Sequence, residues 1–315
     1  MSVRNIIFIS ILMFLVSSCH KDDTQYNNDN EQTIFLANGD VVNNKVIIHD
    51  PDLNMIAYES FLKYLSNSDR FLIVTQKDFE KTFSENKVVL SIRHDMDRNI
   101  DGAIRMAYRE HKYGVKATYF VLHSAKYYGK TELNYFKRND QIIYSLKKLQ
   151  DTFGHEIGFH NDLVTLQVVY NIEPKAFLTE QLKWLRENGI SILGTCAHGS
   201  PWCYVYHYVN TYFWKNAAIE KGFLSYEFIV NPLGTSHMKN MALTNSLNKE
   251  GIKIIKDDIE NYNLDYNSDI FRPDYNFSDC TMYPGGKRWH MGMEDFDKIP
   301  LGSKVVILLH AEHWD

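Results

Sequence analysis

Three apolar segments of the sequence end in the same way, and this pattern constrains the fold more than any other feature. Residues 88–92 lead through Arg93 into His94-Asp95-Met96-Asp97, residues 156–159 lead into His160, and residues 305–309 lead into His310. Apolar, β-branched runs of this kind are typical of parallel strands that are covered on both faces. Because the carboxyl ends of parallel strands meet at one edge, polar residues directly after them indicate a site there.

Helical patterns separate these runs. Residues 101–113, 140–153 and 174–187 have apolar side chains at helical spacing, and each is followed by a glycine that is suited to ending a helix. Further strand-like runs cover residues 116–121, 190–195 and 251–256. The alternation of strands and helices predicts an α/β fold in which a parallel sheet has helices on its outside.

Length and charge narrow the class of protein. The chain has 315 residues, of which 44% are hydrophobic, and this suits one barrel-sized domain or two small ones. Its net charge is −5 and no basic stretch interleaves with aromatic residues, so nucleic acid is not expected as a partner.

The N-terminal segment has the layout of a signal peptide. Arg4 precedes an apolar run over residues 6–16, which is too short to span a bilayer as a mature helix. The ending Leu15-Val16-Ser17-Ser18-Cys19 resembles a bacterial lipobox, which implies that Cys19 is lipidated. We therefore expect a leader over 1–19, a polar linker and lead-in over 20–55, and a barrel-like α/β domain over 56–315. The expected location is the bacterial cell envelope, periplasmic or surface-exposed, with contact to the membrane through the lipid anchor only.

The polar residues after the predicted strands form one set of candidates. Carboxylates and imidazoles come from Asp95 and Asp97, from His160 and Asp162, and from His198 and His310. Carboxylates mixed with imidazoles suit a divalent ion, and zinc is the expected one. Capping of the following helix is the alternative role for Asp97.

These residues carry a resemblance to the polysaccharide deacetylase family, the NodB-homology group of carbohydrate esterases. Asp95-Met96-Asp97 resembles the first motif of the family, Gly154-His155-Glu156-Ile157-Gly158-Phe159-His160 the second, and Leu308-Leu309-His310 the last. The resemblance implies a distorted (β/α)7-8 barrel and a metal-dependent hydrolase that removes an acyl group, N-acetyl above all, from a polysaccharide or glycoconjugate. It also implies that Asp95 is the general base, Asp97 and His160 are metal ligands, and His310 is the general acid.

The sequence departs from the family at two places. The second motif normally supplies another histidine four residues after the first, where this chain has Val164. The third motif is replaced by Ala197-His198-Gly199-Ser200-Pro201. We expect His198 to take the lost ligand position, with Asp162 as the competing candidate.

Three further predictions concern substrate binding, an alternative function and two of the cysteines. Asp279, Arg288 and Trp289 lie in or beside a loop rich in glycine and proline, where substrate recognition is expected. The lost motif histidine leaves a second function open, a lipid-anchored glycan-binding protein without catalysis, because a fold does not fix a function. Cys196 and Cys203 are expected to be buried thiols, with a disulfide between them as the alternative.

Overall fold

The computed structural model describes residues 54–206, 208–216, 253–279 and 293–314, together with the backbone of six short strands elsewhere. The chain divides into two compact units, 1–47 with 229–236 and 48–228 with 237–315. The six short strands are β1 (Gln32–Phe35), β2 (Val41–Asn44), β10 (Phe223–Leu224), β11 (Glu227–Val230), β12 (Gly234–His237) and β13 (Met241–Ala242). They pair only among themselves, β1 with β2, β10 with β13 and β11 with β12.

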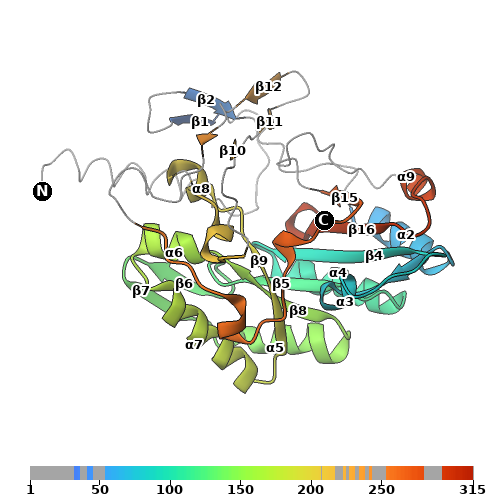
Figure 1. Ribbon diagram of the computed structural model, residues 1–315, viewed down its shortest axis with the longest axis horizontal. Coiled ribbons are helices and arrows are strands. Elements are labelled where there is room, and N and C mark those ends of the chain that lie inside the picture. Colours follow the sequence, from blue (N-terminus) through green and yellow to red (C-terminus); the bar gives the residue numbers. More distant parts are fainter. Residues whose placement is uncertain are drawn as a thin grey trace, which may run out of the picture. The chain divides into compact units, whose positions relative to one another are not determined.

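A curled sheet of eight parallel strands forms a half-barrel in the larger unit (Figure 1). Its order is β14-β9-β8-β5-β4-β16-β15, with β3 beside the first half of β4. The strands are β3 (Phe71–Ile73), β4 (Val88–Met96), β5 (Thr118–Leu122), β8 (Glu156–Asn161), β9 (Ile192–Ala197), β14 (Tyr266–Asn267), β15 (Tyr275–Ser278) and β16 (Lys304–His310). β16, the last strand in the sequence, pairs with the early strand β4, as last and first strands do in a barrel. The described sheet is open between its two outer strands, β14 and β15.

Helices follow the strands as the alternation predicts. They are α2 (Met55–Ser66), α3 (Gln76–Phe79), α4 (Ile100–Lys112), α5 (Ile142–Lys147), α6 (Leu163–Tyr170), α7 (Pro174–Glu187), α8 (Pro201–Tyr206) and α9 (Met293–Asp297). Single turns are η1 (Lys148–Thr152), which continues α5 as a π-helix, and the 3-10 turns η2 (Asn210–Phe213), η3 (Ile259–Tyr262), η4 (Ser268–Ile270) and η5 (Ala311–His313). A hairpin of β6 (Gly129–Glu132) and β7 (Tyr135–Arg138) follows β5. None of the described helices combines the length and apolar character that a membrane span needs.

The predicted strands and helices exist with small shifts of their ends, and one strand does not. Residues 253–256, which we expected to form a strand, belong to no strand. The main hydrophobic core lies between the sheet and its helices, and it contains the buried aromatic residues Tyr208, Tyr212, Phe213 and Trp214. The described part of this aromatic stretch therefore belongs to the hydrophobic core.

Side chains alternate between the helix side and the inside of the curled sheet, as the two-residue period of a strand requires. On β4, His94 faces α4, where its ring bonds to Glu110, whereas Arg93 and Asp95 point to the inside. The inside is narrow. A Cβ atom on Gly194 would lie 1.9 Å from the Tyr266 ring, and one on Gly158 would lie 2.3 Å from the Phe120 ring. Only glycine leaves room for these two rings, which together with Cys196 fill the interior below the site.

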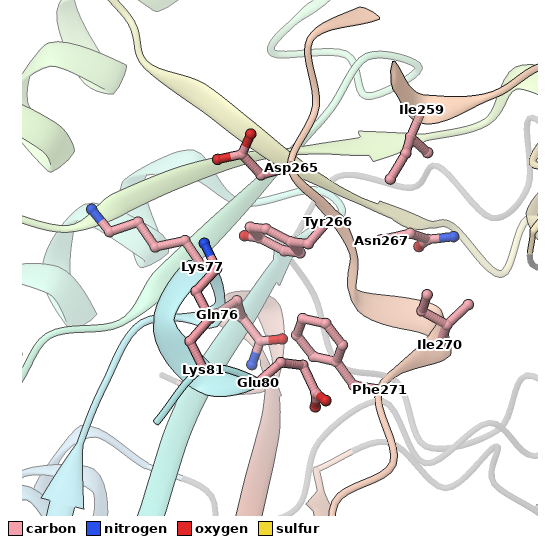
Figure 2. Close-up of a pocket in the computed structure, with 10 residues that line it drawn as sticks. All are labelled: Gln76, Lys77, Glu80, Lys81, Ile259, Asp265, Tyr266, Asn267, Ile270 and Phe271. Atoms are coloured by element: carbon pink, nitrogen blue, oxygen red, sulfur yellow. The ribbon is translucent and has the colours of Figure 1, made fainter. Parts of the chain in front are cut away.

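The amino-terminal end of the half-barrel is closed by α3. Gln76 is fully buried there, and it bonds to Ser91 of β4 and to Ser268 of η4. A pocket of about 250 Å³ lies between α3 and β14 (Figure 2), with Lys77 and Asp265 among its lining residues. It contains none of the histidines, because they stand at the other end of the strands.

Candidate active site

Parallel pairing brings the predicted residues to one end of the sheet. His310 is in register with Asp95, and His160 with Cys196, each at the carboxyl end of its strand. Asp97 follows β4 and His198 follows β9. The sequence prediction that these side chains meet at one edge is confirmed by the contacts of Asp97.

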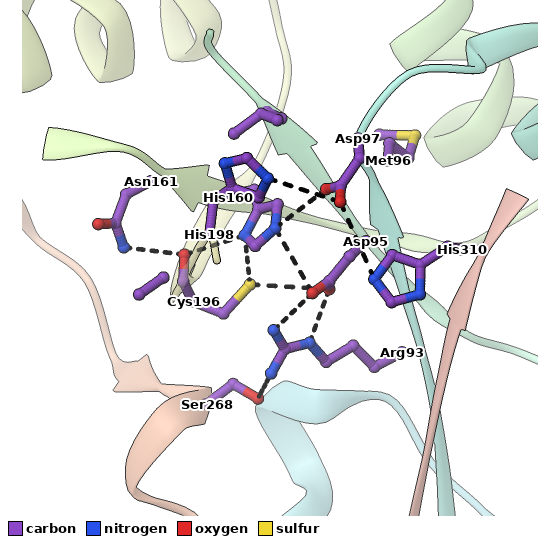
Figure 3. A network of polar contacts seen from close by, with 12 residues as sticks. Arg93, Asp95, Met96, Asp97, His160, Asn161, Cys196, His198, Ser268 and His310 are labelled. Atoms are coloured by element: carbon purple, nitrogen blue, oxygen red, sulfur yellow. Dashed lines mark hydrogen bonds and ion pairs between the residues drawn. The ribbon is translucent and has the colours of Figure 1, made fainter. Parts of the chain in front are cut away.

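Three imidazoles converge on the Asp97 carboxylate (Figure 3). The distances from their Nε2 atoms to the nearer Asp97 oxygen are 3.3 Å for His160, 3.6 Å for His198 and 3.9 Å for His310. Charge-assisted hydrogen bonds are shorter, about 2.7–2.9 Å. Two ligands of a tetrahedral zinc ion, with metal–ligand bonds of about 2.0–2.1 Å, lie about 3.3–3.4 Å apart. The distance from Asp97 to His160, and that from Asp97 to His198, are therefore each close to the distance between two ligands of one ion.

The other nitrogen of each imidazole is held by a second group. Nδ1 of His198 lies 3.0 Å from Asp162, Nδ1 of His310 lies 2.8 Å from Asp279, and Nδ1 of His160 lies 3.2 Å from the backbone oxygen of Cys196. Such partners fix the ring and keep the proton on Nδ1, which leaves Nε2 free to bind a metal or carry a proton. One buried Asp97 oxygen, Oδ1, also has no hydrogen-bond partner in the described part of the chain.

The charges at this end of the sheet depend on one another. Burial alone would raise the pKa of Asp97, but His198, His160 and His310 outweigh it and hold the pKa well below its usual value. Burial alone would lower the pKa of His198, but Asp162 and Asp97 outweigh it and raise the pKa well above its usual value. Without an ion, a proton on His198 offsets part of the negative charge of the buried carboxylates. A divalent cation would supply the same positive charge.

Asp95 is held differently from Asp97. Arg93 donates two hydrogen bonds of 2.7 Å to its two oxygens, from two positions earlier on the same strand. Burial alone would raise the pKa of Asp95, but Arg93 and His160 outweigh it and keep the pKa below its usual value. The same guanidinium bonds to Ser268 and lies 4.0 Å from Asp269. Asp95 is thus an ionised carboxylate in a fixed orientation, with His160 Nε2 3.5 Å from Oδ2.

Asp162 is surrounded by hydrogen-bond donors. Besides His198, its carboxylate accepts from Ser124 (2.6 Å), Asn210 (2.6 Å) and Thr165 (3.2 Å). Asp162 therefore orients His198 in this structure, and its oxygens are occupied by protein donors. Val164, which stands where the family has a histidine, is a buried core residue of α6.

Asp279 is fully buried and contacts His310. Its Oδ2 accepts from the backbone N–H of His310 and from the indole of Trp314, at 2.7 and 2.8 Å. Burial alone would raise the pKa of Asp279, but His310 outweighs it and lowers the pKa far below its usual value. We predicted that Asp279 binds substrate, but in the structure its contacts are those of a residue that holds His310 in place. Arg288, Trp289 and Cys19 lie outside the described residues.

The structure also bears on the alternative roles. Asn99, not Asp97, caps helix α4, because its side chain accepts from the N–H of Gly102. His94 and His155 are buried structural residues, and both face Glu110. Cys196 and Cys203 are buried free thiols, which confirms the first of the two expectations for them.

Sequence reasoning misses two residues of the site. Arg93 lies two positions before Asp95, so the period of the strand alone places both on one face and could have identified it. Cys196 is predicted from the sequence only as a small hydrophobic residue. Its Sγ lies 3.0 Å from Nδ1 of His160 and 3.8 Å from Oδ1 of Asp95.

Within the described residues, two groups have ligand atoms that all lie within 4.8 Å of one another. They are Asp95–His160–Cys196 and Asp279–His310–His313. Comparisons of the chain with protein-family models, with curated proteins and with solved structures found no match. The resemblance to polysaccharide deacetylases therefore stays a prediction from the sequence motifs.

Proposed function

We propose that this protein is a metal-dependent hydrolase that removes an acyl group, N-acetyl above all, from a polysaccharide or glycoconjugate, on a distorted barrel of the polysaccharide deacetylase type. The observation that carries the proposal is the convergence of His160, His198 and His310 on Asp97, at distances suited to groups around an ion. The fixed Asp95 carboxylate beside them supplies a base.

Asp97, His160 and His198 would hold the ion, for which zinc is the best candidate because it accepts mixed nitrogen and oxygen ligands. Three protein ligands leave a coordination position open, and an ion there would supply a Lewis acid beside the acyl carbonyl. The donor set fits this group, since the Nδ1 atoms of both histidines are already held from behind.

Asp95 would take a proton from the water that attacks the acyl carbon. Its bonds to Arg93 keep it ionised and aimed, so that it is ready to act as a base. His310 would give a proton from Nε2 to the leaving amine as the carbon–nitrogen bond breaks. Asp279 holds the opposite nitrogen and favours the charged imidazole before the transfer.

The location follows from the sequence and is part of the proposal. A lipid anchor on Cys19, which the lipobox-like segment suggests, would hold the protein at the bacterial envelope, where surface glycans are within reach. A carbohydrate is therefore the expected partner, and nucleic acid is not.

The first test is metal content. Purified protein should contain about one ion per chain by elemental analysis, and His198→Ala should lose it. Metal retained in His198→Ala would remove His198 from the ligand set. Protein without metal, which also binds none on addition of zinc, would reject the hydrolase in favour of a non-catalytic binder.

The second test is activity on N-acetylated oligosaccharides of defined composition, measured as acetate released. Asp95→Asn and His310→Ala should each lower the rate by about 10²–10⁴-fold while the melting temperature and metal content stay near those of the parent. Full activity in either variant would remove that residue from the mechanism.

A further inference from the structure

Cys196 lies beside His160, with which it is in register. It is fully buried, and its thiol is the contact between the polar site and the aromatic interior formed by Phe120 and Tyr266. The thiol faces His160 and Asp95, at 3.0 and 3.8 Å, and those two residues lie 3.5 Å apart (Figure 3). One ligand atom from each residue, a sulfur, a nitrogen and an oxygen, lies within 4.8 Å of the other two.

The spacing of these three groups suits an ion. With a bond of about 2.3 Å to sulfur and about 2.0–2.1 Å to nitrogen and oxygen, ligand atoms around a tetrahedral ion lie about 3.3–3.6 Å apart. The three contacts among Cys196, His160 and Asp95 are 3.0, 3.8 and 3.5 Å long, and they involve both ring nitrogens of His160 and both carboxylate oxygens of Asp95. Nδ1 of His160 is nearer the thiol and Nε2 is nearer Asp95. The imidazole must therefore turn before one of its nitrogens can bind the same ion as the other two residues.

We propose that Asp95, His160 and Cys196 form an inner metal position, distinct from the outer set of Asp97, His160 and His198, and that it takes soft divalent cations such as Cd²⁺ or excess Zn²⁺. A thiolate ligand selects soft ions over Mg²⁺ or Ca²⁺. Arg93 strengthens this selection, because it already neutralises Asp95 and so removes the charge on which a hard cation depends.

The inner position has a consequence for regulation that rests on the proposed function. His160 belongs to both sets, so one ion at a time can use it. An ion at the inner position also engages Asp95, the proposed base. Soft cations in excess should therefore inhibit the hydrolase by a route that needs the thiol of Cys196.

The test is a titration of metal-free, full-length protein with Cd²⁺, followed by the ultraviolet thiolate-to-cadmium charge-transfer absorption and by the amount of bound metal. Cys196→Ser is compared with Cys203→Ser, a matched control that removes the other buried free thiol of the described residues. We expect the absorption in the parent and in Cys203→Ser, and its loss in Cys196→Ser.

A second variant leaves Cys196 intact, in case Cys196→Ser does not fold. The triple change of Cys19, Cys203 and Cys280 to Ser should keep the full charge-transfer absorption at about one cadmium per chain. Absorption that persists in Cys196→Ser, or disappears in the triple variant, would overturn the inner position.

The outcomes separate this inference from the proposed function. Cadmium bound without any charge-transfer absorption would overturn the inner position while leaving the outer set of Asp97, His160 and His198 in place. No cadmium or zinc bound at all would overturn both.

Discussion

Changing Asp162 to asparagine distinguishes a metal ligand from a residue that orients one. In the structure its carboxylate accepts from Nδ1 of His198 at 3.0 Å and from Ser124 and Asn210 at 2.6 Å each. His198 Nε2, on the other side of the ring, faces Asp97. The amide that replaces the carboxylate would keep one acceptor oxygen and lose the charge, so His198 would be oriented less firmly and would be a weaker ligand.

The expected size of the effect follows from these contacts. Loss of an orienting partner costs about 10–100-fold in metal affinity, which is about 1.4–2.8 kcal/mol. A protein ligand is worth more, because structural zinc sites with four ligands bind with about 10–16 kcal/mol, or roughly 2.5–4 kcal/mol for each ligand. Asp162→Asn should therefore weaken zinc binding by at most about 100-fold, and His198→Ala by about 10²–10³-fold or more.

Competition with a chromophoric chelator measures these affinities. Ser124→Ala is the matched control, since it removes a donor to the same carboxylate without changing the charge or the contact with His198. Its zinc affinity should change less than that of Asp162→Asn. A loss in Asp162→Asn as large as that in His198→Ala would refute the reasoning and make Asp162 a ligand.

Three other predictions concern packing, pH and the proton donor. Gly194→Ala should destabilise the fold by about 1–3 kcal/mol or more in denaturant unfolding, because the added Cβ would lie 1.9 Å from an aromatic ring. Gly199→Ala should change the stability little, because no atom lies within 4 Å of the added Cβ. Equal effects of the two changes would contradict the packing described. Burial alone would raise the pKa of Glu110, but the effect of His94 is larger and lowers this pKa to about 2. This depressed pKa stabilises the fold above the unfolded-state value near 4.5, and the contribution is lost as the pH falls toward about 2. Glu110→Gln should therefore flatten the pH dependence of the unfolding free energy in that window; an unchanged slope would exclude this source. Asp279→Asn should lower the rate of acyl release by about 10–100-fold with zinc content unchanged, and loss of the metal instead would place Asp279 in the ligand set.

Much of the candidate site could be predicted from the sequence, because it depends on local patterns. The apolar runs before Asp95, His160 and His310 predict strands, and the helices between them require those strands to be parallel. Parallel strands then place their carboxyl ends together. The structure bears out this convergence in the contacts of Asp97 with three histidines.

The roles of the carboxylates could not be predicted in the same way. Asp97 and Asp162 have equal chemistry and similar positions after their strands, yet Asp97 faces three Nε2 atoms and Asp162 is enclosed by protein donors. The sequence predicts Asp279 in a recognition loop, but the pairing of β15 with β16 carries it under His310. These differences depend on which loop packs against which.

The sequence by itself determined the strand ends, the alternation of strands with helices and the types of side chain at the site, because the order of apolar and polar residues indicates burial and periodicity. Only the tertiary structure decided two of the partnerships, Asp162 with His198 and Asp279 with His310. The physical reason is that each of these pairs joins residues far apart in sequence. Their distances depend on strand order and register, which are fixed when β16 pairs with β4 and the sheet curls.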